Sequence, residues 1–249
     1  MNRLTTLRQS GSAKVLCPRN HADAAFEAVL LNTAGGLAGG DCLRWEASAG
    51  PGAALRVTTQ TAERVYRSTG GDASVETRLR AEAGASLEWL PQETILFEGS
   101  RLSRRLTIEL AEDANLLAVE AVVLGRRAHG ERVRAGALLD HIRVWQGGRL
   151  VHADSIRMEG DLAALRDRAA TLGGAQAFAT VLLAGPNRMA IDDLRSLLPS
   201  GGGIEAAASA LPSITVIRML APHGDPLRPA LARLLTLLRG GPLPRVWQV

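Results

Sequence analysis

Apolar and polar residues alternate over much of the first 160 positions. In the segment DASVETRLRA, Val75, Thr77 and Leu79 occupy every second position, with polar or charged residues between them. The same period of two appears in ALRVTTQT (54–61) and in LTIEL (106–110). Because successive side chains of a strand point to opposite faces of a sheet, this period predicts half-buried β-strands.

Landmarks between these segments recur at a nearly constant spacing. The landmarks 31 or 32 positions apart are GGD at 39–41 and 70–72, GAAL at 52–55 with GASL at 84–87, and Gln60 with Gln92; DANL at 113–116 is a looser copy of the turn. The Gly or Asp that opens each turn tolerates a positive φ angle. We therefore expect a repeating unit of strand, tight turn and strand, whose copies stack as layers of antiparallel sheet.

A further hairpin is predicted at 140–158, where Gly147-Gly148 suits a two-residue type I′ turn. The apolar pairs that this turn predicts are Val144 with Val151 and Ile142 with Ala153. Polar residues would then share the other face of the hairpin.

That polar face would contain His141, Arg143, His152 and Asp154, with His141 across from Asp154. Imidazole and carboxylate groups suit nickel or zinc, so His141, His152 and Asp154 are a candidate metal site. The alternative interpretation is an ordinary solvated sheet face.

From about residue 161 the pattern changes to short helices between buried strands. Helices are expected within 161–174, within 186–200, and from Asp225 as N-cap to a stop at Gly240. The apolar runs AFATVLLAG and ITVIRMLAP between them predict buried strands.

The sequence thus predicts a mainly β fold: stacked antiparallel strand layers, similar to a β-helix, with a smaller α+β part at the C-terminus. We expect one domain over 1–249, with the β-rich repeat in 1–160 and two or three helices in 161–249. No linker in the sequence is long or polar enough to require two domains.

Composition narrows the class of protein. The two cysteines, Cys17 and Cys42, form no disulfide framework, and residues 1–20 have no apolar signal-peptide core, so we expect a cytoplasmic protein without a membrane partner. The pI near 10 raises the alternative of a basic, nucleic-acid-binding β protein. However, the net charge is only +4 and the arginines are scattered, without the basic stripe and stacking aromatics that such binding uses.

The glycine-rich stretch NTAGGLAGGD (32–41) does not match a nucleotide-binding loop. Gly35 and Gly40 have the P-loop spacing, but Asp41 and Cys42 replace the required Lys and Ser or Thr. The chain also lacks GxSxG and HExxH. The residues favour a non-enzymatic protein, with an enzyme that uses a cleft acid such as Glu93 as a further alternative.

Longer phrases resemble the urease accessory protein UreD family, which is called UreH in some bacteria. The phrases, in family order, are NTAGGLAGGD, GPGA, TTQTAERVYRS, LEWLPQETILFEG, RLSRRLTIEL, VEAVVLGRRAHGE, ATLGGAQAFATVLL and GPLPRVWQV. The resemblance begins at RQSGSAKV and covers almost the whole chain, although the N-terminal segment looks shorter than in many members.

The resemblance implies a non-catalytic scaffold in nickel delivery to apo-urease. Its implied partners are UreF, the GTPase UreG through UreF, and apo-urease itself. It implies no tightly bound cofactor, only transient nickel, which would travel through an internal passage. A partly hydrated Ni²⁺ ion in transit requires scattered, weakly binding oxygen ligands.

Carried onto this sequence, the resemblance implies a set of polar residues that line the passage. That set is Asp41, Thr58, Thr59, Gln60, Glu63, Gln92, Glu93 and Glu131. Tyr66 and Arg67 would hold these acids by hydrogen bonds. The glycines Gly35, Gly36, Gly39 and Gly40 would let the backbone turn and approach a neighbour. For each polar residue, a turn cap or an ordinary strand position is the alternative role.

Overall fold

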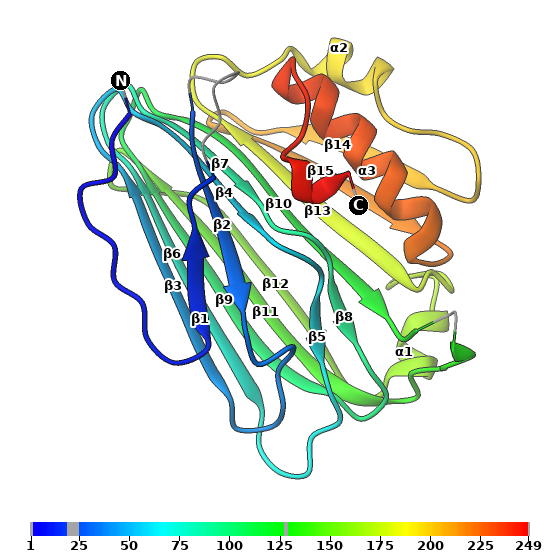
Figure 1. Ribbon diagram of the computed structural model, residues 1–249. Helices are drawn as coiled ribbons and strands as arrows, with labels where there is room; N and C mark the ends of the chain where they lie inside the picture. The colour runs from blue at the N-terminus through cyan, green and yellow to red at the C-terminus, as the bar shows by residue number, and fades with distance from the viewer. Residues whose placement is uncertain (1, 19–24, 127–128, 249) are drawn as a thin grey trace.

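A computed structural model describes residues 2–18, 25–126 and 129–248, which form two stacked β-sheets with the longest helix on one outer face (Figure 1). Sheet A contains β1 (Ala13–Leu16), β2 (Phe26–Asn32), β4 (Ala54–Thr59), β5 (Glu63–Val65), β7 (Ser86–Leu90), β8 (Thr94–Leu96), β10 (Asn115–Leu124), β13 (Ala177–Ala184), β14 (Glu205–Ala210) and β15 (Ile214–Ala221). Sheet B contains β3 (Cys42–Ala49), β6 (Ala73–Ala81), β9 (Arg101–Leu110), β11 (Ala135–Gln146) and β12 (Arg149–Asp161). The mainly β, stacked arrangement expected from the sequence is therefore confirmed.

Between β2 and β11 the chain alternates between the two sheets. After each pass through sheet A, which is β2, β4 with β5, β7 with β8, or β10, the chain crosses to sheet B, and it returns in the next turn. Strands from successive copies therefore run in the same direction, and β4 pairs with β7, and β6 with β9, in parallel. The expectation of antiparallel layers was wrong for this part. A period-two pattern is the same for a hairpin, which stays in one sheet, and for an arch, which joins two sheets.

The repeat landmarks lie beside one another in space. Ala54 pairs with Ser86 and Cys42 with Ser74, each at an offset of 32 residues. At the turns, the Gly52 amide donates to the Ala83 carbonyl at 2.8 Å. The landmarks thus mark equivalent positions of stacked coils, as the spacing predicted.

Two apolar clusters fill the space between the sheets. One cluster surrounds Leu87, Leu106 and Ile108, and the other surrounds Leu96 and Leu138. Strands β13 and β15 continue sheet A beyond β10 in antiparallel order, with every residue of β13 buried. The apolar runs of the C-terminal part thus form strands, as predicted.

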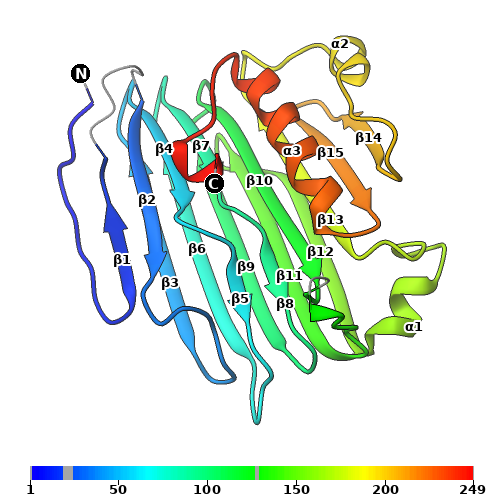
Figure 2. The same ribbon diagram turned by 45° about the vertical axis from the view of Figure 1, so that its right-hand side comes forward.

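The described residues contain three α-helices and a short 3₁₀ helix: α1 (Leu162–Asp167), α2 (Ile191–Ser196), α3 (Gly224–Arg239) and η2 (Arg245–Trp247). Figure 2 shows α3 lying over the outer face of sheet A, where its buried leucines pack against β10, β13 and β15. Gly240 ends α3 in the left-handed conformation, as predicted, but the N-cap is His223 rather than Asp225. Asp225 instead lies in the first turn, where its charge is favourable to the helix dipole.

The β11–β12 hairpin has a different register from the one predicted. A bulge between Val144 and Trp145 shifts the pairing by one residue, so that Val144 faces His152 and Ile142 faces Asp154. Since side chains alternate with a period of two, this shift moves His152 and Asp154 to the inner, apolar side.

Two glycines in the β2–β3 loop are required by close approach of other parts of the chain. A Cβ atom on Gly36 would lie 2.3 Å from a Tyr66 ring carbon and 2.8 Å from the Arg64 carbonyl oxygen. A Cβ atom on Gly39 would lie 2.6 Å from the Gly70 carbonyl oxygen. These glycines therefore allow successive coils to stack closely.

Alanine substitutions in this loop should separate backbone strain from steric overlap. Gly35 has a φ of +79° but open space around it, so Gly35→Ala should lower the free energy of unfolding by about 1–2 kcal/mol. Gly36→Ala adds the overlap and should cost about 3 kcal/mol or more. Urea unfolding of the two variants measures both values, and equal losses would contradict the assignment.

Candidate functional site

The strands of sheet A are interrupted at the same height in three neighbouring coils. β2 ends at Asn32, β4 and β5 are separated by 60–62, and β7 and β8 are separated by 91–93. Strand β10 is continuous and pairs with both β7 and β8. We call residues 32–36, 60–62 and 91–93 the strand break; it brings backbone and side-chain polar groups of distant sequence positions together.

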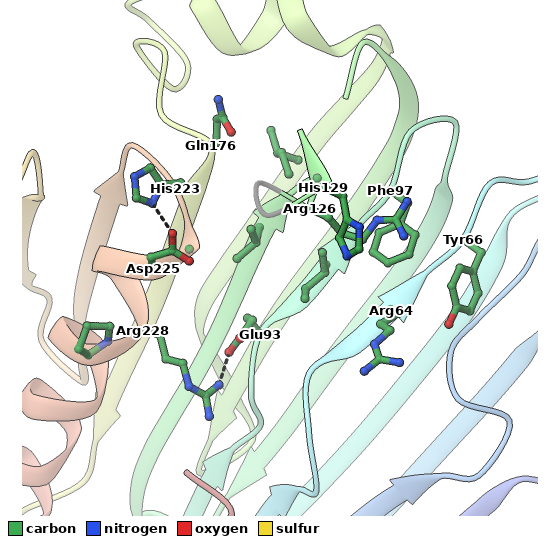
Figure 3. A pocket seen from close by; sticks show the side chains of 16 residues that line it. Arg64, Tyr66, Glu93, Phe97, Arg126, His129, Gln176, His223, Asp225 and Arg228 are labelled. Atoms are coloured by element: carbon green, nitrogen blue, oxygen red, sulfur yellow. Dashed lines mark hydrogen bonds and ion pairs between the residues drawn. The ribbon is translucent and has the colours of Figure 1, made fainter. Parts of the chain in front are cut away.

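Glu93 lies at the outer side of the strand break, in a cavity of about 520 Å³ beside the N-terminus of α3 (Figure 3). Its carboxylate accepts a hydrogen bond from Arg228 of α3 at 2.8 Å. Arg64 and Arg126 also line this cavity, and His223 is paired with Asp225 at its rim. The cavity thus has an apolar wall that includes Ile95, Phe97 and Val123, with charged groups of both signs set into it.

Gln92 fastens the C-terminal segment to the strand break. Its amide nitrogen lies within hydrogen-bond distance of three backbone oxygens, those of Thr59, Gln60 and Val246, at 2.9–3.2 Å. The Thr59 hydroxyl accepts from the Gln92 backbone amide at 2.9 Å. Two of the predicted lining residues, Thr59 and Gln92, are therefore engaged in holding the backbone.

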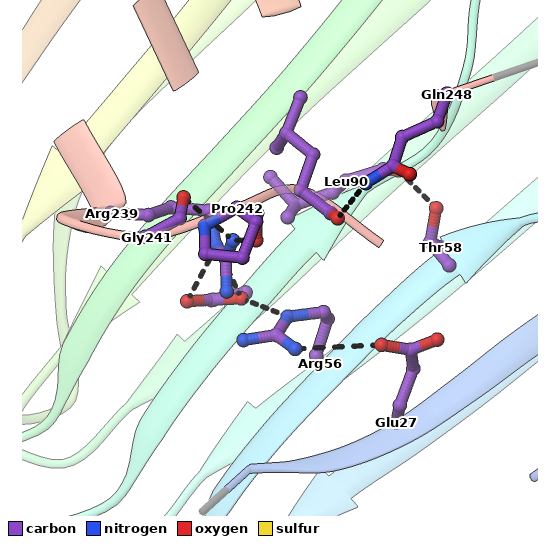
Figure 4. Close-up of polar contacts among 10 residues, drawn as sticks. Glu27, Arg56, Thr58, Leu90, Arg239, Gly241, Pro242 and Gln248 are labelled. Carbon is purple, nitrogen blue, oxygen red and sulfur yellow. Dashed lines mark hydrogen bonds and ion pairs between the residues drawn. The ribbon is translucent and has the colours of Figure 1, made fainter. Parts of the chain in front are cut away.

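The neighbouring carbonyl of Leu90 accepts two further bonds, from the buried Thr58 hydroxyl at 2.7 Å and from the Trp247 ring nitrogen at 3.0 Å. Figure 4 shows this region with the adjacent ion pairs of Arg56. Arg56 contacts Glu27 there at 3.4 Å. Thr58 therefore has a structural role beneath the end of the chain.

Glu63 closes the strand break at the start of β5. Its two carboxylate oxygens each lie 3.3 Å from the side-chain nitrogen of Asn32, and its backbone amide donates to the Glu93 carbonyl. Burial raises the pKa of Glu63 above its ordinary value, although the hydrogen bonds from Asn32 and Arg64 act in the opposite direction. Glu63 and Glu93 are thus joined through the backbone.

A charged group that the sequence reasoning missed lies inside the sandwich behind the strand break. Arg104 of β9 contacts Asp140 of β11 and Glu120 of β10, each at 2.5 Å, and donates to the Thr94 hydroxyl at 3.2 Å. Trp89 donates to the second oxygen of Glu120 at 2.8 Å. Charged residues at inward positions of otherwise apolar strands were the signal that could have found this cluster.

The pKa values in this cluster follow from burial and pairing. Burial disfavours the charge of Arg104, but the carboxylates of Asp140 and Glu120 more than offset it and raise the pKa. Burial raises the pKa of Glu120 despite its contact with Arg104. Two carboxylates and one guanidinium therefore share a space of low dielectric constant, where each depends on the others.

Polar residues continue from this cluster towards the edge of the sandwich. In the strand register, Glu120 lies opposite Thr180 of β13, and Thr180 lies opposite Arg218 of β15. Arg218 donates to the Thr180 hydroxyl at 3.1 Å and to Asp154 of β12 at 2.8 Å, so this contact joins the two sheets. We call Thr94, Arg104, Glu120, Asp140, Thr180, Arg218 and Asp154 the polar layer.

The remaining predicted residues lie apart from the strand break or serve other contacts. Asp41 is exposed and accepts a hydrogen bond from the Ala38 amide at 2.7 Å, which makes it a turn cap. Glu131 accepts from Arg126 and from the Glu98 amide. Tyr66 donates to the Gly35 carbonyl at 3.0 Å rather than to an acid.

Arg67 was also expected to hold one of the acids. It is exposed, its side chain lies against Gly99, and its backbone forms a bridge with Ser100.

The candidate metal face on the hairpin is not assembled as predicted. His141 lies on the outer side of sheet B, where its Nδ1 is 2.9 Å from the Ser155 hydroxyl, whereas His152 and Asp154 face inward. Within residues 2–18, 25–126 and 129–248, no three His, Cys, Asp or Glu side chains are grouped closely enough to hold a metal ion. The one-residue shift at the bulge explains the error.

Comparison with known proteins decides the family. A family model described as "UreD urease accessory protein" matches residues 1–248. The chain belongs to the UreD family. Two relatives named urease accessory protein UreD, from Methylobacterium sp. (strain 4-46) and Chelativorans sp. (strain BNC1), are each 49% identical to it over 99% of the chain, covering 89% and 88% of the relatives. A UreD protein of Rhizobium etli is 47% identical over 99% of the chain and covers 90% of that relative.

Membership of the UreD family confirms the resemblance seen in the sequence. The family and its named relatives are accessory proteins of urease, so the chain is an accessory protein and not an enzyme. Among the described residues, no helix combines the length and apolarity needed to cross a membrane.

Removal of Arg104 should expose the dependence of the buried charges on one another. Arg104→Met leaves Glu120 and Asp140 without a counter-charge and should lower the free energy of unfolding by about 3–5 kcal/mol. The triple variant R104M/E120Q/D140N carries no buried charge here and should recover much of that loss. Urea unfolding of both proteins tests this, and a triple variant as unstable as the single one would refute the account.

Two glutamates should respond to pH in opposite directions. Folding raises the pKa of Glu63, so above the pKa that this group has in the unfolded chain its ionisation destabilises the fold. Glu63→Gln should therefore raise Tm at pH 7, and the gain should disappear by about pH 4. Burial acts to raise the pKa of Glu131, but hydrogen bonds from Arg126 and from the backbone outweigh it and lower the pKa. Glu131→Gln should therefore lower Tm at pH 7, with a loss that fades as pH falls. Thermal melts across pH 4–7 measure both, and shifts of the same sign would contradict the assignment.

Proposed function

We propose that this UreD-family chain is a scaffold that delivers nickel to apo-urease, in a complex with UreF and, through UreF, with the GTPase UreG. We place this activity in the cytoplasm. The family description and the names of the relatives support a role in urease maturation. The partners and the cargo are our proposal.

The observation that carries the proposal is the polar layer inside a sandwich whose interior is mainly apolar. Glu93 faces the outer cavity, and the next residue, Thr94, faces the interior and contacts Arg104. Polar groups then follow through Glu120 and Thr180 to the edge of the sandwich. We propose that nickel crosses sheet A at the strand break and moves along this layer.

The chemistry of the layer suits an ion in transit. Its oxygen groups are carboxylates and hydroxyls that come from different strands, and Arg104 and Arg218 pair with the carboxylates. Within the described residues, no three His, Cys, Asp or Glu side chains form a closed metal site. Scattered carboxylates and hydroxyls replace only part of the hydration shell of a divalent ion and therefore bind it weakly. Several weak sites in series favour passage over retention.

The nucleic-acid alternative finds no support on the outer side of sheet B. The cations there are interleaved with acids: Arg44 and Arg78 both contact Glu76, and Arg101 contacts Asp72 and Glu159. A phosphate backbone requires cations that are free to contact phosphate groups along a continuous track.

The membership of the proposed complex can be tested by co-expression. Co-expression of the chain with UreF should give a soluble complex with equal amounts of both proteins, and addition of UreG should enlarge it. Size-exclusion chromatography with light scattering measures the composition. A chain that elutes alone in the presence of UreF would refute the proposed partnership.

The route can be tested by nickel content of urease activated in the presence of variant complexes. Glu93→Gln should reduce nickel incorporation by roughly tenfold, the effect of losing a contact worth about 1.4 kcal/mol, while the complex still forms. Glu109→Gln, on the solvent side of sheet B, is the matched control and should leave incorporation unchanged. Equal incorporation by the two variants would exclude a route past Glu93.

A further inference from the structure

The described interior contains an imidazole nitrogen without a hydrogen-bond partner. The side chain of His152 in β12 is buried, with 9% of the residue exposed, and its Nε2 atom has no partner within the described part of the chain. Buried polar atoms are nearly always satisfied, so an exception of this kind points to an ion or a water molecule that completes the site.

Asp154 lies beside His152 on the same inner side of β12. The two residues are separated by one position, which places their backbones roughly 6.6 Å apart and their side chains on one face. One oxygen of Asp154 accepts from the Ser155 amide at 2.9 Å, and the other accepts from Arg218 at 2.8 Å. Both side chains thus face the edge of the polar layer.

Arg218 is held less firmly than the buried Arg104. Its side chain is 49% exposed, although it reaches both Asp154 and the Thr180 hydroxyl. A half-exposed guanidinium is already partly hydrated, so it can move fully into solvent at little cost. A cation that takes its place beside Asp154 keeps the charge of that carboxylate compensated.

The two inward side chains match the preferences of a borderline divalent ion. A neutral imidazole offers a nitrogen lone pair, and a carboxylate adds an oxygen and a negative charge, which together suit nickel, zinc or copper better than magnesium or calcium. Burial disfavours the protonated form of His152 and lowers its pKa, although the charge of Asp154 acts in the opposite direction. Two protein ligands, completed by water, make a weak site.

We propose that His152 Nε2 and the Asp154 carboxylate bind one divalent metal ion at the edge of the polar layer, with Arg218 covering the site until the ion arrives. The choice of nickel as the ion rests on the proposed function. Arg218 donates to both Asp154 and the Thr180 hydroxyl, and Thr180 lies opposite Glu120 in the strand register. An ion bound beside Asp154 is therefore at one end of the polar layer.

Titration of the full chain with NiCl₂ by isothermal calorimetry tests the site. His152→Gln should weaken nickel binding at this site at least tenfold, and Arg218→Met should strengthen it several-fold because the competing cation is removed. His141→Gln is the matched control: it removes an imidazole three strand positions away in register and on the opposite face of the sheet, and it should bind nickel like the wild type. With Co²⁺ as a spectroscopic probe, the visible absorption of an imidazole-bound ion should be lost in His152→Gln only.

The folding of the variants does not limit the test. Gln is polar and similar in size to His, so His152→Gln should leave Tm near the wild-type value, and Arg218→Met keeps His152 intact as a second, independent measurement. Equal nickel affinity of His152→Gln and His141→Gln overturns the proposal, as does an Arg218→Met variant that binds no more tightly than the wild type.

This outcome is separable from that of the proposed function. Nickel binding is measured on the isolated chain, whereas the route past Glu93 is measured by nickel in activated urease. A His152→Gln variant that retains its nickel while Glu93→Gln blocks incorporation overturns the site and leaves the delivery function standing. A loss of nickel in His152→Gln, together with normal incorporation by Glu93→Gln, supports the site and refutes the route.

Discussion

In the repeat part of this protein, each pass of the chain through one sheet is followed by a crossing to the opposite sheet, and this alternation determines which residues can meet. Within the coils, a strand pairs with its counterpart one coil later, as β4 does with β7 in sheet A and β6 with β9 in sheet B. The ladder contacts between coils therefore recur at intervals of one coil. The close approach at Gly36 and Gly39, the parallel ladders and the alignment of the strand break in neighbouring coils all follow from it.

Alternation also decides where charge can be buried. Because both sheets contribute an inner face, a charged residue at an inner position must find its partner on another strand, and Arg104 finds one in each sheet, in Glu120 and Asp140. Removing three charges from water is unfavourable unless their mutual contacts are good, so such a group is poor evidence of selection for stability. Its position directly behind the strand break, in contact with Thr94, fits a role in handling a cation.

The sequence was informative where a local pattern has one structural meaning. The stacking of coils at a spacing of 32 residues, the glycine turns and the long C-terminal helix could all be predicted, because a repeat, a turn and a helix each have a recognisable pattern in the sequence. Strand direction could not, because a hairpin and an arch have the same alternation. The hairpin register failed at a single bulge after Val144, which no residue type marks, and that bulge separated His141 from His152 and Asp154.

The candidate site was predictable only in part for a related reason. Thr58, Thr59, Gln60, Glu63, Gln92 and Glu93 share two sequence motifs at the spacing of one coil, so they come together at the strand break. The polar layer draws single residues from β8, β9, β10, β11, β12, β13 and β15, and its members have no common spacing. A charged residue in an inward, apolar setting, such as Glu120 in VEAVV, was the available sign.

The anchoring of the last residues has a consequence for synthesis in the cell. Trp247 and Val246 bond to Leu90 and Gln92, more than 150 residues earlier in the chain, and α3 covers the apolar outer side of β10, β13 and β15. While the ribosome is still making the final segment, that apolar surface has been translated but has no cover. The nascent chain therefore passes through an interval in which it is prone to aggregate, and this interval ends only when residues 224–247 have left the ribosome and packed onto sheet A.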